Sequence, residues 1–223
     1  MHCPARNGTG LESRNMARGL VWNAERMAVP LLRPTMQRST PEIDELTLAR
    51  ARRGEDAACR AVFRHYQRAV YCLAWRMLGG RANPALVEDL TQETFLRVFK
   101  SLAGFASDGT ARLSTWILTI ATRLALNEQR NQRRAIVATI PTTAEPIADV
   151  RADETAYRRA LGEILEREIG KLAPDHRAVF LLREYHELDY AEIARVLEIQ
   201  IGTVQSRLSR ARAALRLALE DVR

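Results

Sequence analysis

The sequence predicts an all-α protein, with two small helical domains joined by a flexible linker and the second domain ending in a helix-turn-helix. Three observations predict this fold. Apolar residues recur every three or four positions, no stretch alternates polar and apolar residues for long, and the helical period is lost over residues 135–152, which hold two prolines. The 223 residues are 47% hydrophobic, which is enough for packed cores.

Residues 1–40 show no sustained helical period and contain three prolines and scattered arginines. We expect them to form a disordered tail, or to lie upstream of the true start of translation. The sequence does not decide among four possible starts, which are Met1, Met16, Met27 and Met36. The helical pattern begins only after the last of these, and a short regulatory tail is the alternative interpretation.

The first domain is expected over residues 41–134. Pro41 and the acidic residues that follow it predict a helix start, and Gly54 ends that first helix. Paired glycines, an Asn-Pro step and a turn-rich loop over 103–110 separate the later helices. These are expected over residues 55–78, 84–102 and 113–134.

The second domain is expected over residues 153–223, after a linker over 135–152. Asp189 is positioned to cap a short helix, and Glu192, three residues later, completes the pattern of a capping box. A turn of three residues separates this helix from a longer one, which predicts a helix-turn-helix. The four expected helices cover residues 154–171, 174–186, 190–197 and 201–219.

The last helix combines an apolar seam with an outward face that carries arginines but no acids. Residues 201–219 contain four arginines and no Asp or Glu, whereas an ordinary solvated face mixes both signs. The expected seam is Ile201, Val204, Leu208, Ala211 and Leu215. The expected outward face is Gln205, Ser206, Ser209, Arg210 and Arg216. This pattern favours a recognition helix in the DNA major groove over a merely soluble surface.

The helix over 113–134 has a second one-sided pattern. Its inward residues are expected to be Trp116, Ile117, Ile120, Ala121 and Leu124. Another face carries Thr119, Arg123, Leu126, Arg130 and Arg133. Beside a loop that contains Phe105, this basic stripe could hold a DNA strand through its phosphates and receive unstacked bases. An ordinary helix with surface arginines is the alternative.

The helix over 84–102 presents an opposite kind of surface. Its polar face carries Asp89, Gln92, Glu93, Leu96 and Arg97. The residues expected to pack elsewhere are Val87, Leu90, Phe95, Val98, Phe99 and Leu102. A leucine within an acidic face is what a protein partner would bury, but a solvated face would look similar, so both interpretations stay open.

Composition narrows the class of function. The net charge is +7, and only Lys100 and Lys171 among the 34 basic residues are lysines, which favours a nucleic-acid partner. Three irregularly spaced cysteines and four scattered histidines predict no disulfide framework, metal site or catalytic centre. We expect no cofactor and no enzymatic activity. With no signal peptide and no apolar segment long enough to insert in a membrane, a cytoplasmic location is expected.

Three segments together resemble the extracytoplasmic-function (ECF, group IV) sigma factors of the sigma-70 family. Residues 89–98, DLTQETFLRV, resemble the region 2 helix that docks on RNA polymerase. Residues 113–121, LSTWILTIA, resemble the promoter-melting helix. Residues 188–194, LDYAEIA, with residues 201–212, IGTVQSRLSRAR, are similar to the helix-turn-helix that reads the −35 element. The resemblance covers residues 42–220 in the family's order.

The resemblance implies a transcription initiation factor without chemistry of its own. Region 2 would dock on the clamp helices of the largest subunit of the polymerase core and bind the −10 element of promoter DNA, while region 4 would bind the −35 element. The core-binding residues would be Asp89, Gln92, Glu93, Leu96 and Arg97. The −10 and melting residues would be Phe105, Arg112, Trp116, Thr119, Arg123, Arg130 and Arg133. The −35 residues would be Thr203, Gln205, Ser206, Arg207, Ser209, Arg210 and Arg216.

The chain departs from the family pattern at three positions. Glu198 stands where the turn commonly has Gly, so either the turn is strained or it needs no left-handed residue. Gln205 replaces a residue that is usually basic. Arg123 stands where Asn is frequent, beside the pocket for a flipped −10 base. With a loop over 103–112 that is slightly long, this last change leaves the −10 preference undetermined.

Two other functions remain as alternatives. One is a helix-turn-helix transcriptional regulator that acts without replacing a sigma factor, and the other is a helical adaptor that binds only protein. The region over 84–134 separates them, because a simple regulator needs neither an acidic docking face nor a basic melting helix. The sequence leaves open the regulon, the inducing signal and whether an anti-sigma factor holds this chain inactive.

Overall fold

The computed structural model describes residues 42–80, 82–105, 112–136 and 154–220, and within these ranges every regular element is helical. The expected all-α class is confirmed for them. The first half contains α3 (Glu45–Arg52), α4 (Asp56–Met77), α5 (Pro84–Ser101), a short 3-10 turn η2 (Leu102–Gly104) and α6 (Leu113–Ile136). The second half contains α7 (Glu154–Lys171), α8 (Pro174–Glu184), α9 (Tyr190–Leu197) and α10 (Ile201–Glu220). The tail over 1–40 and all but the first two residues of the expected linker lie outside the described residues.

The start of the first helix differs from the expectation. The helix begins at Glu45, and Asp44 is its N-cap, because the Asp44 carboxylate accepts a hydrogen bond from the Thr47 amide at 2.8 Å. The preceding acid, Glu42, lies before the helix and has another role. Its carboxylate accepts a hydrogen bond from the Ser114 amide at 3.3 Å, at the start of α6, and another from the Tyr66 hydroxyl at 3.1 Å.

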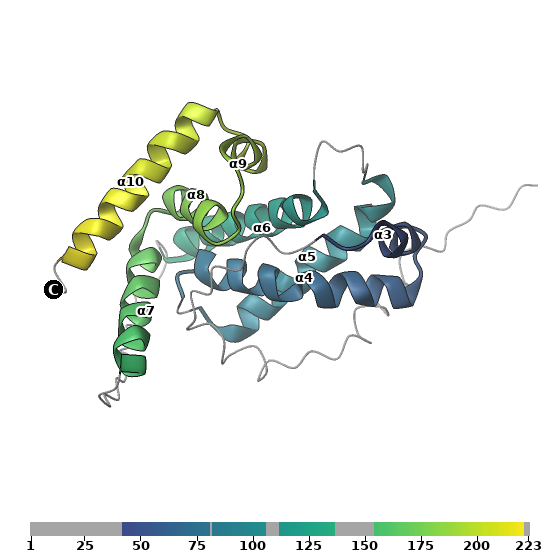
Figure 1. Ribbon diagram of the computed structural model, residues 1–223, viewed down its shortest axis with the longest axis horizontal. Coiled ribbons are helices and arrows are strands. Elements are labelled where there is room, and N and C mark those ends of the chain that lie inside the picture. The colour runs from purple at the N-terminus through teal and green to yellow at the C-terminus, as the bar shows by residue number, and fades with distance from the viewer. Residues whose placement is uncertain (1–41, 81, 106–111, 137–153, 221–223) are drawn as a thin grey trace, which may run out of the picture.

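The first half packs around α4, which contacts α3, α5 and α6. Figure 1 shows α4 and α6 running side by side along the molecule, with α3 near one end. The face of α4 that meets α5 is apolar, and the rings of Phe63 and Phe95 meet edge to face with centroids 4.8 Å apart. Among the described residues, no helix is both long and apolar enough to cross a membrane.

The second half begins with α7 and contacts α4 through α7 and α8, and α6 through α8 and α9 (Figure 1). Its buried apolar side chains join those of the first half in one continuous cluster. Gly79 and Gly170 allow the backbones of the two halves to approach closely, because a Cβ on Gly170 would lie 2.7 Å from the Gly79 carbonyl oxygen. Arg177 of α8 fixes the same contact by donating to the Met77 carbonyl of α4 at 2.5 Å and to three carbonyls at the end of α7 and just beyond it.

The helices α9 and α10 are separated by three residues, as expected. The capping box is present, since Asp189 accepts from the Glu192 amide and Glu192 accepts from the Asp189 amide. Glu198, the first residue of the turn, adopts a left-handed backbone with φ 55° and ψ 46°. The left-handed position therefore exists, and it is held by a residue that carries a side chain.

The expected seam of α10 is correct at four of its five positions. Val204, Leu208, Ala211 and Leu215 are buried, but Ile201 is 47% exposed. The expectation for Ile201 was wrong because it is the first residue of α10, where helical period alone does not show whether a neighbouring helix reaches far enough to cover it.

Candidate nucleic-acid interface and protein-docking surfaces

The face of α10 that we expected to turn outward is exposed along its whole length. Gln205, Ser206, Ser209, Arg210 and Arg216 are all exposed, and Thr203 near the helix start is partly buried. A hollow of about 340 Å³ lies along this face, between the start of α9 and the middle of α10, and is lined partly by Gln205, Ser209 and Arg216. The face can thus offer amide, hydroxyl and guanidinium groups to a partner, which are the groups that read base edges.

The four arginines of α10 fall into two pairs with different surroundings. Arg207 forms an ion pair with Asp175 at 3.1 Å and Arg212 forms one with Glu184 at 2.5 Å, so both reach α8. Within the described part of the chain, no ion pair joins Arg210 or Arg216 to an acid. The structure therefore directs Arg207, one of the seven expected −35 residues, toward its own domain as well as toward solvent.

The basic stripe of α6 is also present at the surface. Arg112, Arg123, Arg130 and Arg133 are exposed, while Thr119 is partly buried and donates to the Thr115 carbonyl at 2.8 Å. The inward side is as expected, with Ile117 and Ala121 buried and Trp116, Ile120 and Leu124 packed against the core. Two residues of α6 meet acids of the second half: the buried Thr115 donates to Glu192 at 3.1 Å, and Arg123 of the stripe pairs with Glu198 at 2.7 Å.

A groove of about 550 Å³ opens at the start of the stripe, and its walls come from α5, α6 and the turn between them. It is lined by Arg97, Ser101, Gly104, Phe105, Trp116, Ile120 and Arg123. Phe105 is only 8% exposed and packs against Trp116, with ring centroids 5.0 Å apart, so it forms a wall of the groove. An aromatic wall next to guanidinium and hydroxyl groups suits a planar base.

The polar face of α5 has the composition that we expected. Asp89, Gln92 and Arg97 are exposed, whereas Glu93 and Leu96 are partly buried. Glu93 and Arg97, one turn apart, form an ion pair at 2.7 Å. On the opposite side Val87, Leu90, Phe95, Val98 and Leu102 are buried. The face is therefore a mixed acidic surface with one accessible leucine near its centre.

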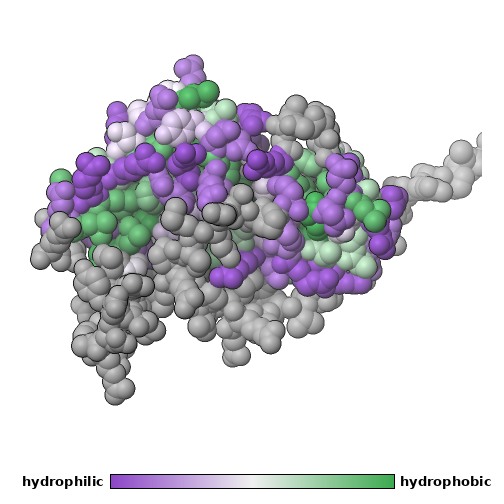
Figure 2. Space-filling view, viewed as in Figure 1, coloured by the Kyte–Doolittle hydropathy of each residue, from purple (hydrophilic) through white to green (hydrophobic). Residues whose placement is uncertain are grey.

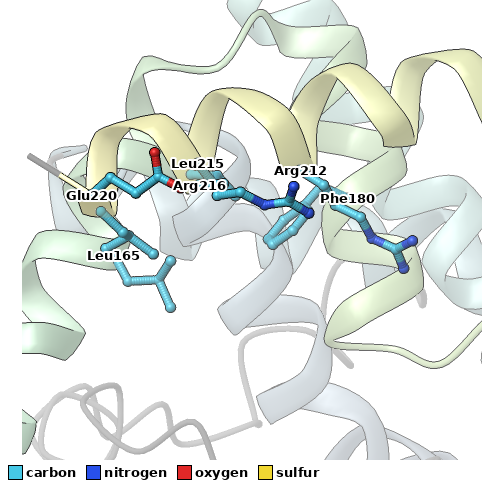
Figure 3. A pocket seen from close by; sticks show the side chains of 7 residues that line it. Leu165, Phe180, Arg212, Leu215, Arg216 and Glu220 are labelled. Carbon is cyan, nitrogen blue, oxygen red and sulfur yellow. The ribbon is translucent and has the colours of Figure 1, made fainter.

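The second half carries an apolar groove of about 490 Å³ that the sequence did not predict. Figure 3 shows the side chains that line it, with Leu165 from α7, Phe180 from α8, and Leu215 and Glu220 from α10. Figure 2 shows the corresponding apolar surface between α10 and α7, bordered by hydrophilic residues. These apolar residues follow ordinary helical period, so nothing in the sequence separates a groove residue from a core residue. Grooves of this composition are typical of protein-binding surfaces.

Among the described residues, neither the cysteine thiols nor the side chains that commonly bind metal ions form a reactive or metal-binding site. Burial raises the pKa of Cys59 and of Cys72, which keeps both thiols protonated and unreactive. No group of three or more His, Cys, Asp or Glu is placed to hold a metal ion in the described ranges.

Comparison with known proteins gives separate matches for the first and the second half of the chain. Residues 62–135 match the family described as Sigma-70 region 2, and residues 162–215 match Sigma-70, region 4. The ECF RNA polymerase sigma factor SigW of Bacillus subtilis is 30% identical over 184 residues, which cover 78% of this chain and 96% of that protein. SigE of Mycolicibacterium smegmatis, also an ECF RNA polymerase sigma factor, is 34% identical over 155 residues, which cover 69% of this chain and 58% of that protein.

Solved structures agree on the fold. The sigma factor RpoE in complex with the anti-sigma factor NepR from Bartonella quintana is 21% identical, with a TM-score of 0.56 over 74% of this chain and 98% of that one. CnrH in complex with the cytosolic domain of CnrY is 23% identical, with a TM-score of 0.57 over 80% of this chain and 97% of that one. With both regions matched in the family's order and a 30% identical relative covered almost completely, the chain belongs to the ECF RNA polymerase sigma factors.

Proposed function

We propose that this sigma factor divides its work among three surfaces, which act by binding and carry out no chemistry of their own. The core-docking face is Asp89, Gln92, Glu93, Leu96 and Arg97 of α5. The observation that carries the proposal is the presence, on one helical unit, of this acidic face and of the basic stripe on α6. A regulator that leaves initiation to another factor needs only the α10 face, and an adaptor needs neither basic surface.

The core-docking face fits the clamp helices of the largest polymerase subunit. Leu96 is partly buried within an acidic surround, so a partner would cover an apolar contact while its own basic groups meet the acids at the rim. Leu96→Ala should weaken binding to core polymerase, with little change in helical content. Lys100→Ala, an exposed change on the same helix, is the matched control.

The α6 stripe and the groove beside it fit a single strand of the −10 element. Arg112, Arg123, Arg130 and Arg133 are exposed and would follow its phosphates. Phe105 and Trp116 line the groove and would form the stacking wall for one unstacked base. Thr119 of α6 would contact the strand outside the groove.

The α10 face fits the major groove of the −35 element. Gln205, Ser206, Ser209 and Arg210 lie in the middle of the exposed face, where base edges would be within reach, and Arg216 lies further along, toward the phosphates. Thr203 near the helix start would contact the backbone. Arg207 would need to exchange its ion pair with Asp175 for a phosphate, so its share in binding should be the smallest.

Initiation in a purified system tests the whole proposal. The full chain is mixed with core polymerase from a related bacterium and genomic promoter fragments, and specific transcripts are mapped. We expect defined start sites, with protected −10 and −35 elements in footprints of the holoenzyme. Specific DNA binding without initiation would favour the regulator, and binding to protein alone would favour the adaptor. Action at promoters also places the protein in the cytoplasm.

An anti-sigma factor is an additional partner that we include in the proposal. Two fold relatives were solved in complexes whose descriptions name an anti-sigma factor or the cytosolic domain of a partner protein. If such a protein exists for this chain, adding it in equimolar amount should abolish initiation in the same assay. Unchanged transcript yields with every candidate tested would remove it from the list of partners.

A further inference from the structure

The segment over residues 42–52, which includes α3, belongs to none of the three proposed surfaces. It also lies outside residues 62–135, which match Sigma-70 region 2. Figure 1 shows α3 at the end of the molecule where α6 begins, and α3 contacts η2, the turn that precedes Phe105. Two side chains of this segment, Glu42 and Arg52, reach the elements that carry the aromatic wall of the groove between α5 and α6.

Glu42 holds the start of α6. Ser114 is the second residue of that helix, and an amide in the first turn of a helix has no partner within the helix. The Glu42 carboxylate accepts a hydrogen bond from this amide at 3.3 Å and another from the Ser114 hydroxyl. Glu42 therefore caps α6 from 72 positions away, and its negative charge suits the positive end of the helix. Trp116 lies in the turn that is fixed in this way.

Tyr66 of α4 fixes the Glu42 carboxylate in turn. The Tyr66 side chain is buried, and its hydroxyl donates to Glu42 at 3.1 Å and accepts from the Ile43 amide at 3.2 Å. Burial raises the pKa of Tyr66, so the hydroxyl keeps its proton and remains a donor. Glu42 is thus joined to the core of the first half through α4, although its own side chain is exposed.

Arg52, at the end of α3, holds the other aromatic residue of the wall. Its guanidinium lies 5.6 Å from the centre of the Phe105 ring and donates to the Phe105 carbonyl. The same ring packs against Trp116. Among the described residues no acid pairs with Arg52, and its Nε is buried without an acceptor. Because a buried donor without an acceptor costs folding free energy, stability alone does not account for an arginine at this position.

We propose that Glu42 and Arg52 are positioning residues for the −10 element, which hold the Trp116 and Phe105 rings where an unstacked base can stack on them. The proposal rests on the proposed function of the α6 stripe and its groove. Neither Glu42 nor Arg52 lines the groove, so both act through the residues that they hold. Without them the rings would be in place in only a fraction of the molecules, and the apparent affinity for a strand would fall by that fraction.

Strand binding by the holoenzyme tests the proposal. The probes are a fluorescent single strand with the −10 element of a promoter mapped in the initiation assay, and a duplex with the −35 element of the same promoter. Glu42→Ala removes the acceptor of the Ser114 amide and should lower the affinity for the strand about three- to tenfold. The affinities for the −35 duplex and for core polymerase should not change, whereas a general loss of folding would lower all three.

Two further variants separate hydrogen bonding from charge. Glu42→Gln loses the same charge but keeps an oxygen that can accept from Ser114, so it should bind the strand within about twofold of the native chain. Glu45→Ala, which removes another exposed acid of the same segment, should also bind like the native chain. The proposal is overturned if Glu42→Ala binds the strand like the native chain, or if either control loses as much affinity as Glu42→Ala.

Arg52→Ala tests the Phe105 side of the wall. It should lower the affinity for the strand by a similar factor and leave the affinity for the −35 duplex unchanged. Arg53→Ala is the matched control, because it removes an equal charge from an exposed neighbour that pairs with Glu55. Equal losses in the two variants would mean that positive charge near the DNA, and not the position of Phe105, is responsible, and would overturn the role of Arg52.

Arg130→Ala separates failure of the positioning role from failure of the proposed strand-binding surface. Arg130 is an exposed arginine of the α6 stripe. If Arg130→Ala weakens strand binding and neither Glu42→Ala nor Arg52→Ala does, the stripe binds the strand and the positioning role is wrong. If all three variants bind like the native chain, the proposed −10 surface is itself wrong, and the positioning role is wrong with it.

Discussion

Two groups of arginines in this molecule differ in their burial and in the groups that they contact. At the contact between the halves, Arg76 and Arg177 are buried and each has several partners. On the face of α10, Arg210 and Arg216 are exposed, and no acid among the described residues pairs with them. The same side chain therefore serves as a structural donor in one region and as an available cation in the other. Burial and partners, rather than residue type, separate the two roles.

If burial separates the two groups of arginines, removing a buried arginine should have the largest effect on stability. Arg177 donates to the carbonyls of Met77, Ile169, Gly170 and Leu172, and all four would lose a donor in Arg177→Ala. We expect the free energy of unfolding to fall by about 3–5 kcal/mol. Urea titration followed by circular dichroism measures it. The matched control, Arg210→Ala, should change it by about 0.5 kcal/mol or less. A loss under about 1 kcal/mol for Arg177→Ala would mean that water replaces the guanidinium.

A pH titration probes the same buried region. Burial and the positive charge of Arg76 lower the pKa of His186 to about 4. The unfolded chain takes up this proton near pH 6.5, so between about pH 6.5 and 4 protonation favours unfolding. The free energy of unfolding should fall on acidification by up to about 1.4 kcal/mol per pH unit from this group.

The variant His186→Gln isolates that effect from other titrating groups. Its unfolding free energy should depend less on pH than that of the native chain between pH 6.5 and 4, and the two should differ little in slope above pH 7. Parallel curves over the whole range would show that His186 is protonated as easily in the folded protein as in the unfolded one.

Helix bounds and capping could be predicted from the sequence, whereas contacts between the halves could not. The box of Asp189 and Glu192 uses a local spacing, and the structure contains it as predicted. Glu166 of α7 pairs with Arg76, which lies 90 positions away, and no local spacing in the sequence indicates this contact. The helical period predicts which residues share a face of a helix, but it does not predict which distant helix packs against that face.

In the candidate site, too, local features could be predicted from the sequence and contacts between distant residues could not. The exposed residues of α10 and α5 follow directly from helical period. Phe105 was expected to be available to an unstacked base, and the structure buries most of its ring against Trp116, so it serves as a wall of the groove and not as a freely exposed ring. From the sequence alone, an aromatic residue in a loop is compatible with exposure to a base or with burial, because its burial depends on how the following helix packs.

The exposed arginines should affect DNA binding without affecting stability. Arg210 lies within the reading face, where its guanidinium can make two parallel hydrogen bonds to guanine. Arg210→Ala should cost the holoenzyme about 1–3 kcal/mol and relax the preference at one −35 base pair. Arg216→Ala should weaken all sequences about equally and reduce the salt slope by about one counterion.

Binding of the two holoenzyme variants to a set of −35 duplexes, at several salt concentrations, separates the two effects. The pair serve as controls for each other because both are exposed arginines of one helix. Unchanged base preference in Arg210→Ala would assign base reading to Gln205 and Ser209, and would mean that α10 enters the groove in a different orientation.

The smallest expected effect concerns the turn before α10. A left-handed conformation costs a residue with a side chain about 1 kcal/mol relative to glycine, and Glu198 pays this cost in the structure. The exposed ion pair with Arg123 offsets part of it, by about 0.2–1 kcal/mol. Glu198→Gly removes both terms and should change unfolding free energy little, whereas in an Arg123→Ala background it should stabilise by close to 1 kcal/mol. Urea titration of the four proteins in this cycle measures the difference. If Glu198→Gly destabilises the chain equally with and without Arg123, the left-handed turn carries no strain, and its side chain needs another explanation.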